Sequence, residues 1–240
     1  MSYVFSQFFS VDSPKAIKAN AYGWLNAINY MAPADTAGVG NLCAWASPPC
    51  MALCLGEHSG QASMRKEGED NAVTLSRKAK AIMFMRERAR FMKELAAGIA
   101  RVERKAKRLG MQLCVRLNGA TDLNWVAVVK AYPHIQFVDY TKSPQRALAH
   151  AAGKLPANYH ITFSYSGTNA ADCERVVAAG GNVAVVFSGA FPQTYFGAPV
   201  INGDLSDLRH LDPRGVVVAL SPKGAKAKRE GVKLGFVIAT

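Results

Sequence analysis

Residues 159–187 read YHITFSYSGTNAADCERVVAAGGNVAVVF, and this stretch decides the fold class of the chain. Two apolar runs, Tyr159–Tyr165 and Val183–Phe187, are rich in β-branched and aromatic residues, which favours strands. Between them, Ala170–Ala179 follows a helical pattern that ends at Gly180 and Gly181. Because a strand, a helix and a second strand follow one another, we expect a parallel pair joined by a right-handed crossover.

The same alternation continues on both sides of this stretch. Helices are expected at Leu123–Ala131 and Pro144–Ala152. The other expected strands are Leu113–Leu117, Ile135–Tyr140, Gly215–Leu220 and Gly235–Ile238. Runs such as NVAVVF have no polar alternation, which indicates strands buried on both faces. We therefore expect an α/β fold that forms a partial or closed TIM-like barrel of parallel strands, with a doubly wound open sheet as the alternative.

Helical patterns dominate the N-terminal half of the chain. Apolar residues recur at steps of three or four from Asn71 to Leu109, which predicts one long helix or two helices bent near Gly98. Ala16–Met31 is a shorter helical pattern. We accordingly divide the chain into an N-terminal helical and cysteine-loop extension, residues 1–42, packed on a single barrel-like domain, residues 43–240.

The composition excludes several classes of protein. Half of the 240 residues are hydrophobic and 19% are charged, so a large core is expected and global disorder is not. We find neither a secretory leader nor an apolar stretch of about 18 residues, which predicts a cytoplasmic protein without a membrane span. The five cysteines are an odd number, which favours free thiols or metal ligands over a disulfide framework.

Three cysteines, Cys43, Cys50 and Cys54, lie within twelve residues of one another. Thiolates bind soft metals, so three of them on one proline-rich loop predict a metal site. The sequence leaves open a four-iron iron–sulfur cluster with one open iron and a zinc ion completed by His58. A small molecule or Cys173 would take the fourth position of a cluster. The alternative is that the three cysteines are small buried hydrophobic side chains.

Polar side chains recur where each expected strand ends. Ligands of α/β barrels bind over the carboxyl ends of the strands, so these side chains are candidate site residues. Lysine and arginine suit a carboxylate or phosphate, and an aspartate can orient a hydroxyl or transfer a proton. We assign catalysis to Asp122, Asp139 and Lys142, and substrate binding to Arg116, Asn118, Tyr140, Thr141, Ser164 and Ser166. For each residue alone, a role in a turn or helix cap is the alternative.

Five segments occur in an order that resembles a known family. They are the cysteine segment, RLNGATDL (116–123), DYTKSP (139–144), ITFSYSG (161–167) and GDLSDLRHLDPRG (203–215). Over roughly residues 41–238 they resemble the gene-product-88-like proteins of bacteriophages and mobile elements. Such proteins are in turn distantly similar to radical S-adenosylmethionine enzymes, in which a cysteine loop feeds a partial barrel. The resemblance implies an iron–sulfur cluster and S-adenosylmethionine as cofactors. The spacing C-x6-C-x3-C and Leu55 beside the last cysteine depart from the usual pattern of that superfamily.

The chain carries a formal net charge of +12, which favours an anionic partner such as a nucleic acid or a phosphate-bearing substrate. Basic residues recur at steps of three or four along the long helical pattern. Among them, we assign Arg101, Arg104 and Arg108 to nucleic-acid binding. A solvated helix face, with interspersed glutamates, is the alternative.

Three functional hypotheses follow from the sequence. The first is a phage- or mobile-element-encoded iron–sulfur protein that, as an enzyme, performs radical chemistry on a small-molecule or nucleic-acid substrate. The second is a basic nucleic-acid-binding or host-takeover protein with structural zinc or no metal. The third is a virion structural protein. Neither the substrate nor the oligomeric state can be derived from the sequence.

Overall fold

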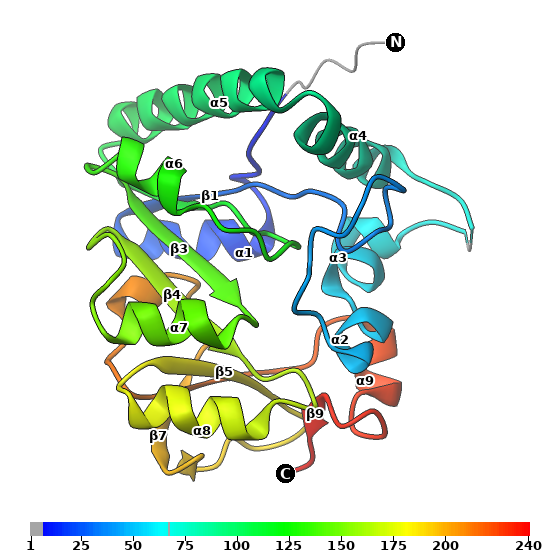
Figure 1. Cartoon of the computed structure of the whole chain (residues 1–240), viewed down its shortest axis with the longest axis vertical. Helices are drawn as coiled ribbons and strands as arrows, with labels where there is room; N and C mark the ends of the chain where they lie inside the picture. The colour runs from blue at the N-terminus through cyan, green and yellow to red at the C-terminus, as the bar shows by residue number, and fades with distance from the viewer. Residues whose placement is uncertain (1–6, 67) are drawn as a thin grey trace.

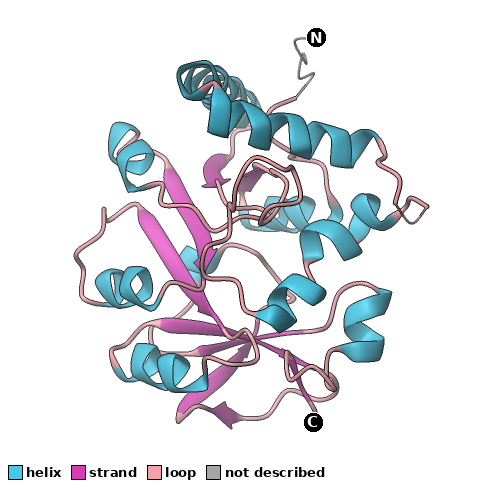
Figure 2. Cartoon of the chain, turned by 45° about the vertical axis from the view of Figure 1, so that its right-hand side comes forward, coloured by secondary structure: helices cyan, strands magenta, loops and turns pink. Residues whose placement is uncertain are grey.

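A computed structural model describes residues 7–66 and 68–240. Over these residues the chain forms a mostly parallel nine-stranded sheet with helices packed around it (Figures 1 and 2). The strands are β1 (Trp24–Ile28), β2 (Gln112–Arg116), β3 (Gln136–Thr141), β4 (Tyr159–Ser164), β5 (Asn182–Phe187), β6 (Thr194–Tyr195), β7 (Ala198–Asn202), β8 (Val217–Leu220) and β9 (Val237–Ile238). Their order is β1-β2-β3-β4-β5-β8-β7-β6, and β9 pairs with β5.

Helices connect most of the strands. The α-helices are α1 (Pro14–Ile17), α2 (Pro48–Ala52), α3 (Leu55–His58), α4 (Ala72–Arg86), α5 (Arg88–Arg108), α6 (Val126–Ala131), α7 (Pro144–Ala151), α8 (Ala170–Ala178) and α9 (Ala225–Glu230). Short 3-10 helices are η1 (Lys18–Tyr22), η2 (Gly60–Ser63) and η3 (Arg209–Leu211). No helix in the described part of the chain is both long enough and apolar enough to cross a membrane.

The expected α/β fold with parallel strands is confirmed. All the strand pairs are parallel except β6 with β7. Closure into a complete barrel is not found, because β1 and β6 end the strand order and, within residues 7–66 and 68–240, do not pair with each other. The observed sheet is therefore open.

The helix expected over Ala16–Met31 is wrong for its second half. Trp24–Ile28 forms β1, which pairs in parallel with β2 and places Leu25 opposite Leu113. Leu25 is almost fully buried. Pairing with a strand much later in the chain has overridden the local helical pattern.

The long helical pattern is divided at a different residue from the one expected. Helices α4 and α5 meet at Glu87, whose backbone φ of −129° lies outside the helical region. Gly98 lies inside α5, where a Cβ atom would come within 2.9 Å of Phe8 Cβ. Glycine at this position therefore permits close packing of the N-terminal segment on α5 and does not bend the helix.

Two hydrophobic cores cover one face of the sheet. The larger core packs α4, α5 and α6 on β1 to β4, with the Trp125 ring centroid 5.4 Å from that of Phe84 and 6.2 Å from that of Phe91. The smaller core packs α7 and α8 on β4, β5 and β8.

Candidate functional site

The cysteine segment is attached to the carboxyl edge of the sheet through α2. Ser47 caps this helix by accepting a hydrogen bond from the Cys50 backbone N–H at 3.2 Å. The Ser47 hydroxyl also donates to the backbone oxygen of Ser166, directly after β4. Next to this bond, a Cβ atom on Gly167 would lie 3.2 Å from Pro49 Cγ, so the two loops are in close contact. Helices α2 and α3 lie on the right of Figure 1, beside α9.

The three clustered thiols are half-buried, whereas Cys114 and Cys173 are fully buried. Cys43 Sγ accepts a hydrogen bond from the Ala34 N–H at 3.3 Å. It also donates to the Ala120 backbone oxygen at 3.6 Å. Residue 120 belongs to the loop after β2, so this thiol connects the cysteine segment to a second strand end.

The three thiols and the ammonium of Lys142 lie within electrostatic range of one another. Burial raises the pKa of Cys43, with a further contribution from Cys50. Burial and then the Cys50 and Cys43 thiols raise the pKa of Cys54 to about 11. Burial opposes a charge on Lys142, yet its pKa is raised, because Cys50, Asp122, Cys43 and Cys54 favour the ammonium. The thiols and this cation therefore lie near enough to influence one another's charge.

The described residues hold no group of three His, Cys, Asp or Glu side chains placed to bind a single metal ion. The two residues suggested for a fourth position also have other surroundings. Cys173 is buried in the smaller core with Val176 and Phe163. The charged neighbours of His58 are Lys226, Glu57 and Arg65. This site therefore consists of the three thiols and Lys142.

Asp122 fixes the end of β3. One carboxylate oxygen accepts hydrogen bonds from Thr141 Oγ1 at 2.8 Å and from Arg146 at 2.7 Å. The other oxygen accepts from the Lys142 backbone N–H at 2.8 Å. With the Asp122 side chain 3% and the Arg146 side chain 11% exposed, the ion pair is buried. Asp122 thus positions Lys142 by accepting a hydrogen bond from the Lys142 backbone N–H. Arg146 also belongs to this group of side chains, and the sequence analysis missed it because nothing in the sequence indicates that Arg146 pairs with Asp122.

Asp139 lies in the larger core and not at the cysteine segment. Its carboxylate accepts hydrogen bonds from the Asn118 backbone N–H at 2.7 Å, the Asn118 amide at 3.2 Å and the Tyr159 hydroxyl at 2.9 Å. The Asn118 side-chain oxygen in turn accepts from Thr121, Leu123 and Trp125. These two side chains organise the loop between β2 and α6.

Tyr140 and Arg116 lie on the opposite face of the sheet from Asp139, because neighbouring side chains alternate along a strand. The Arg116 guanidinium lies 4.6 Å from the centre of the Tyr140 ring. Burial raises the pKa of Tyr140 to about 12. The structure thus divides the expected binding residues between two faces.

The remaining expected site residues lie in two places. Ser164 and Ser166 are in the segment after β4, where the Ser164 oxygen accepts from Asn169 and the Ser166 N–H donates to Asn169. Arg101, Arg104 and Arg108 are exposed on α5, at the top of Figure 1 and away from α2. The structure therefore brings Cys43, Cys50, Cys54, Asp122, Thr141, Lys142 and Ser166 to one edge of the sheet.

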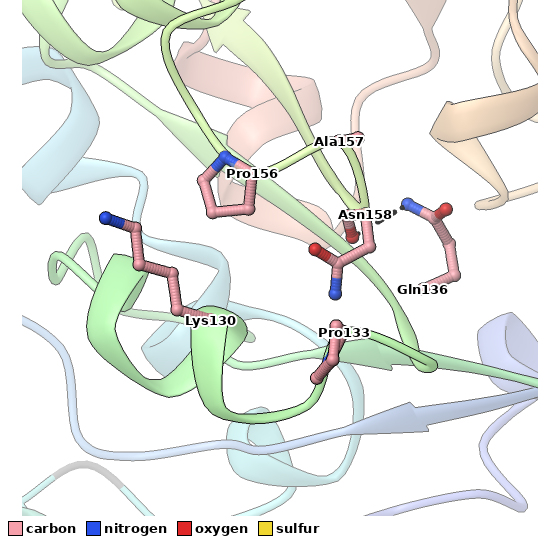
Figure 3. A pocket seen from close by; sticks show the side chains of 6 residues that line it. All are labelled: Lys130, Pro133, Gln136, Pro156, Ala157 and Asn158. Atoms are coloured by element: carbon pink, nitrogen blue, oxygen red, sulfur yellow. Dashed lines mark hydrogen bonds between the residues drawn. The ribbon is translucent and has the colours of Figure 1, made fainter.

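A hollow of about 600 Å³ lies at the opposite edge, beside the amino ends of β3 and β4 (Figure 3). The Gln136 and Asn158 amides that line it are engaged with the protein. The Gln136 amide donates to the backbone oxygen of Asn158 at 3.2 Å, and the Asn158 amide donates to the Tyr132 and Ile135 oxygens. Ligands of parallel sheets bind at the carboxyl edge, so we do not place the functional site here.

The buried carboxyl of Asp139 predicts a measurable pH dependence of stability. Burial raises its pKa to about 7, whereas an unfolded aspartate titrates near 3.9. Between these values the folded state binds the extra proton, so the free energy of unfolding falls as pH rises, by up to about 1.4 kcal/mol per pH unit. We expect Asp139→Asn to remove this slope in urea unfolding between about pH 4.5 and 7.

Comparing the pH dependence of the wild type with that of the Asp139→Asn variant isolates the contribution of Asp139. Burial lowers the pKa of His160 to about 3 and of His210 to about 4, which produces a slope of the opposite sign. Both histidines are present in both proteins, so their contribution cancels in the difference. Equal slopes for the wild type and Asp139→Asn would contradict a raised pKa.

Comparisons with known proteins bear on the family alone. A search of curated proteins and a search of solved structures each returned no match. The family model described as gene product 88 matches residues 8–235, which is nearly the whole chain. This match covers strands β1 to β8, the cysteine segment and the strand ends that surround it. The chain therefore belongs to the gene product 88 family.

Proposed function

We propose that the chain binds an iron–sulfur cluster through Cys43, Cys50 and Cys54. The observation that carries this proposal is that three half-buried thiols of one segment lie within electrostatic range of one another and of Lys142, at the carboxyl edge of the sheet. Thiolates are the preferred ligands of such clusters, and the site supplies three.

A cluster and a single zinc ion place different demands on the positions of their thiolate ligands. A single ion needs its ligands in direct contact with one centre, and the described residues offer no such group. A cluster contains several irons, so its thiolate ligands lie farther apart. Cluster binding would also remove the protons that burial and mutual repulsion now hold on Cys43 and Cys54.

The lysine fits this role as well. A cluster with thiolate ligands is anionic, and a buried cation beside it lowers the cost of placing that charge away from water. Thiolates and Asp122 raise the pKa of Lys142, so the ammonium would stay charged beside thiolates that hold a cluster. When bound, an iron–sulfur cluster supplies one-electron chemistry, and an open iron with S-adenosylmethionine as cosubstrate would make the protein a radical enzyme.

Anaerobic reconstitution of the full chain with iron and sulfide tests the proposal. We expect a brown protein with broad visible absorption and with iron and sulfide in similar amounts by metal and sulfide analysis. Protein that stays colourless, or that retains zinc alone, would contradict it. The same preparation then shows whether S-adenosylmethionine changes the electron paramagnetic resonance spectrum of the reduced protein.

A second candidate function is nucleic-acid binding by α5, favoured by the charge of its last two turns. Arg104, Lys107 and Arg108 are exposed, and none of them makes an ion pair with any described residue. The neighbouring carboxylate of Glu103 is paired with His134 at 2.9 Å. Such a surface attracts the phosphate backbone without reading its sequence.

Replacing Arg101, Arg104 and Arg108 with glutamine is expected to weaken binding of duplex DNA and to reduce the slope of log K against log salt by about 0.9 per lost phosphate contact. Fluorescence anisotropy at several salt concentrations measures both quantities. The matched control replaces Lys226, Lys228 and Arg229 of α9, which changes the net charge equally. Equal effects of the two triple variants would remove α5 as the binding surface.

A further inference from the structure

A second feature of the carboxyl edge is a hollow of about 290 Å³ beside the thiols. Its walls come from the cysteine segment, the end of β3 and the loop between β4 and α8. The lining residues include Trp45, Ser47, Lys142, Ser166, Asn169 and Asp172. Its volume is close to the lower limit of small-molecule pockets, roughly 300 Å³.

The hollow contains a cation that the protein does not neutralise by direct contact. The Lys142 ammonium makes no hydrogen bond or ion pair with any described residue. The carboxylate that raises its pKa, Asp122, is already engaged with Thr141, Arg146 and the Lys142 backbone N–H. The ammonium is therefore available to a ligand.

The hydroxyl-bearing residue Ser166 lines the same hollow. Ser166 is only 2% exposed, and its backbone N–H and oxygen are bonded to Asn169 and Ser47. Its hydroxyl, by contrast, has no hydrogen-bond partner among residues 7–66 and 68–240. Ser166 Oγ is not a buried orphan atom, so the hydroxyl reaches solvent at the hollow, where it can donate to a ligand.

One helix, α8, adds positive potential at the hollow. It begins after Asn169, which lines the hollow, whereas α7 is capped by Ser143, which accepts a hydrogen bond from the Arg146 N–H. The Asn169 side chain does not cap α8, because its oxygen accepts from the Ser166 N–H. Unpaired N–H groups at a helix start favour an anion. The one carboxylate at the rim, Asp172, is paired with Arg175.

Trp45 adds an aromatic surface. Its side chain is 45% exposed at the edge of the hollow. An exposed indole offers a planar face on which a second planar ring can stack.

We propose that this hollow binds a small molecule that carries a phosphate or carboxylate on a planar ring, with the anion between Lys142 and Ser166 and the ring against Trp45. Because the lysine and the hydroxyl are in place without a cluster, the binding does not require iron. The inference therefore extends beyond cluster binding and can be tested separately from it.

Calorimetric titration of the iron-free chain tests the site with four probes. Adenosine monophosphate carries an anion and a ring, benzoate replaces the phosphate with a carboxylate, and inorganic phosphate and adenosine each supply one half. We expect adenosine monophosphate or benzoate to bind more tightly than inorganic phosphate or adenosine, and the preferred one identifies the anion. The proposal would be overturned if neither adenosine monophosphate nor benzoate bound to the chain.

Three variants locate the binding. Lys142→Met removes the charge while retaining the length of the side chain, and it is expected to weaken the anionic probe at least about tenfold. Ser166→Ala is a smaller change, expected to weaken the same probe severalfold, and it keeps the test valid if Lys142→Met does not fold. Trp45→Ala is expected to weaken ring-bearing probes and leave inorganic phosphate unchanged. Lys154→Met, at an exposed lysine outside the hollow, is the control. The proposed site would be overturned if Lys154→Met weakened binding as much as Lys142→Met. It would also be overturned if neither Lys142→Met nor Ser166→Ala weakened binding.

Discussion

Serine in place of Cys43, Cys50 or Cys54 is expected to reduce the iron content and visible absorption of the reconstituted protein to background. Each thiolate would hold a different iron of the cluster, and a hydroxyl at the same position is a much poorer ligand for iron. Each of the three single variants should therefore fail to retain the cluster. Iron and sulfide analysis after anaerobic gel filtration measures the loss.

The two remaining cysteines provide the matched controls. Cys114 and Cys173 are fully buried and lie outside the group of thiols around Lys142. Cys114→Ala and Cys173→Ala are expected to retain the cluster, with a modest loss of stability from the small cavity left behind. Loss of iron in either control, or retention in any of the three serine variants, would refute the assignment of ligands.

Asp122→Asn is expected to lower the free energy of unfolding by about 3–5 kcal/mol. The substitution keeps the shape of the side chain but leaves the buried Arg146 guanidinium without a counter-charge. It also turns one acceptor into a donor among the Thr141, Lys142 and Arg146 donors that Asp122 now satisfies. Urea unfolding followed by tryptophan fluorescence measures the change.

Asp172→Asn is the control for Asp122→Asn. Asp172 also pairs with an arginine, Arg175, but this pair is exposed, with side chains 31% and 63% accessible. Exposed pairs contribute less than about 1 kcal/mol. Similar losses for the two variants would mean that burial of the Asp122–Arg146 pair does not determine its contribution.

The sequence predicts the central strands and their helices well, because their local patterns agree with their tertiary environment. The run NVAVVF is buried in β5, and Pro144–Ala151 begins at a serine cap with proline in the first turn. The segment from Trp24 to Ile28 behaves differently. Its apolar positions suit a helix or a buried strand, and only pairing with β2 decides between them.

The candidate site is predicted in its residue types but not in its geometry. Strand-end position alone places Asp139 and Tyr140 together, although the alternation of side chains sends them to opposite faces. The clustering of Cys43, Cys50 and Cys54 is evident from their spacing, whereas their convergence on Lys142 depends on how the loop folds back. The contribution of Trp45 has no signal in the sequence, because a single exposed tryptophan is not specific.

The pairing of β1 with β2 has a consequence for how the protein is made. On the ribosome, residues 24–28 emerge long before their partner strand, residues 112–116. At about 5–20 residues per second, roughly 4–18 s pass before Arg116 can meet Ile28. During that interval the apolar segment 24–28 lacks the β2 strand with which it pairs in the sheet. Nascent chains stalled before residue 112 should therefore be bound by chaperones, whereas full-length chains should be released from them.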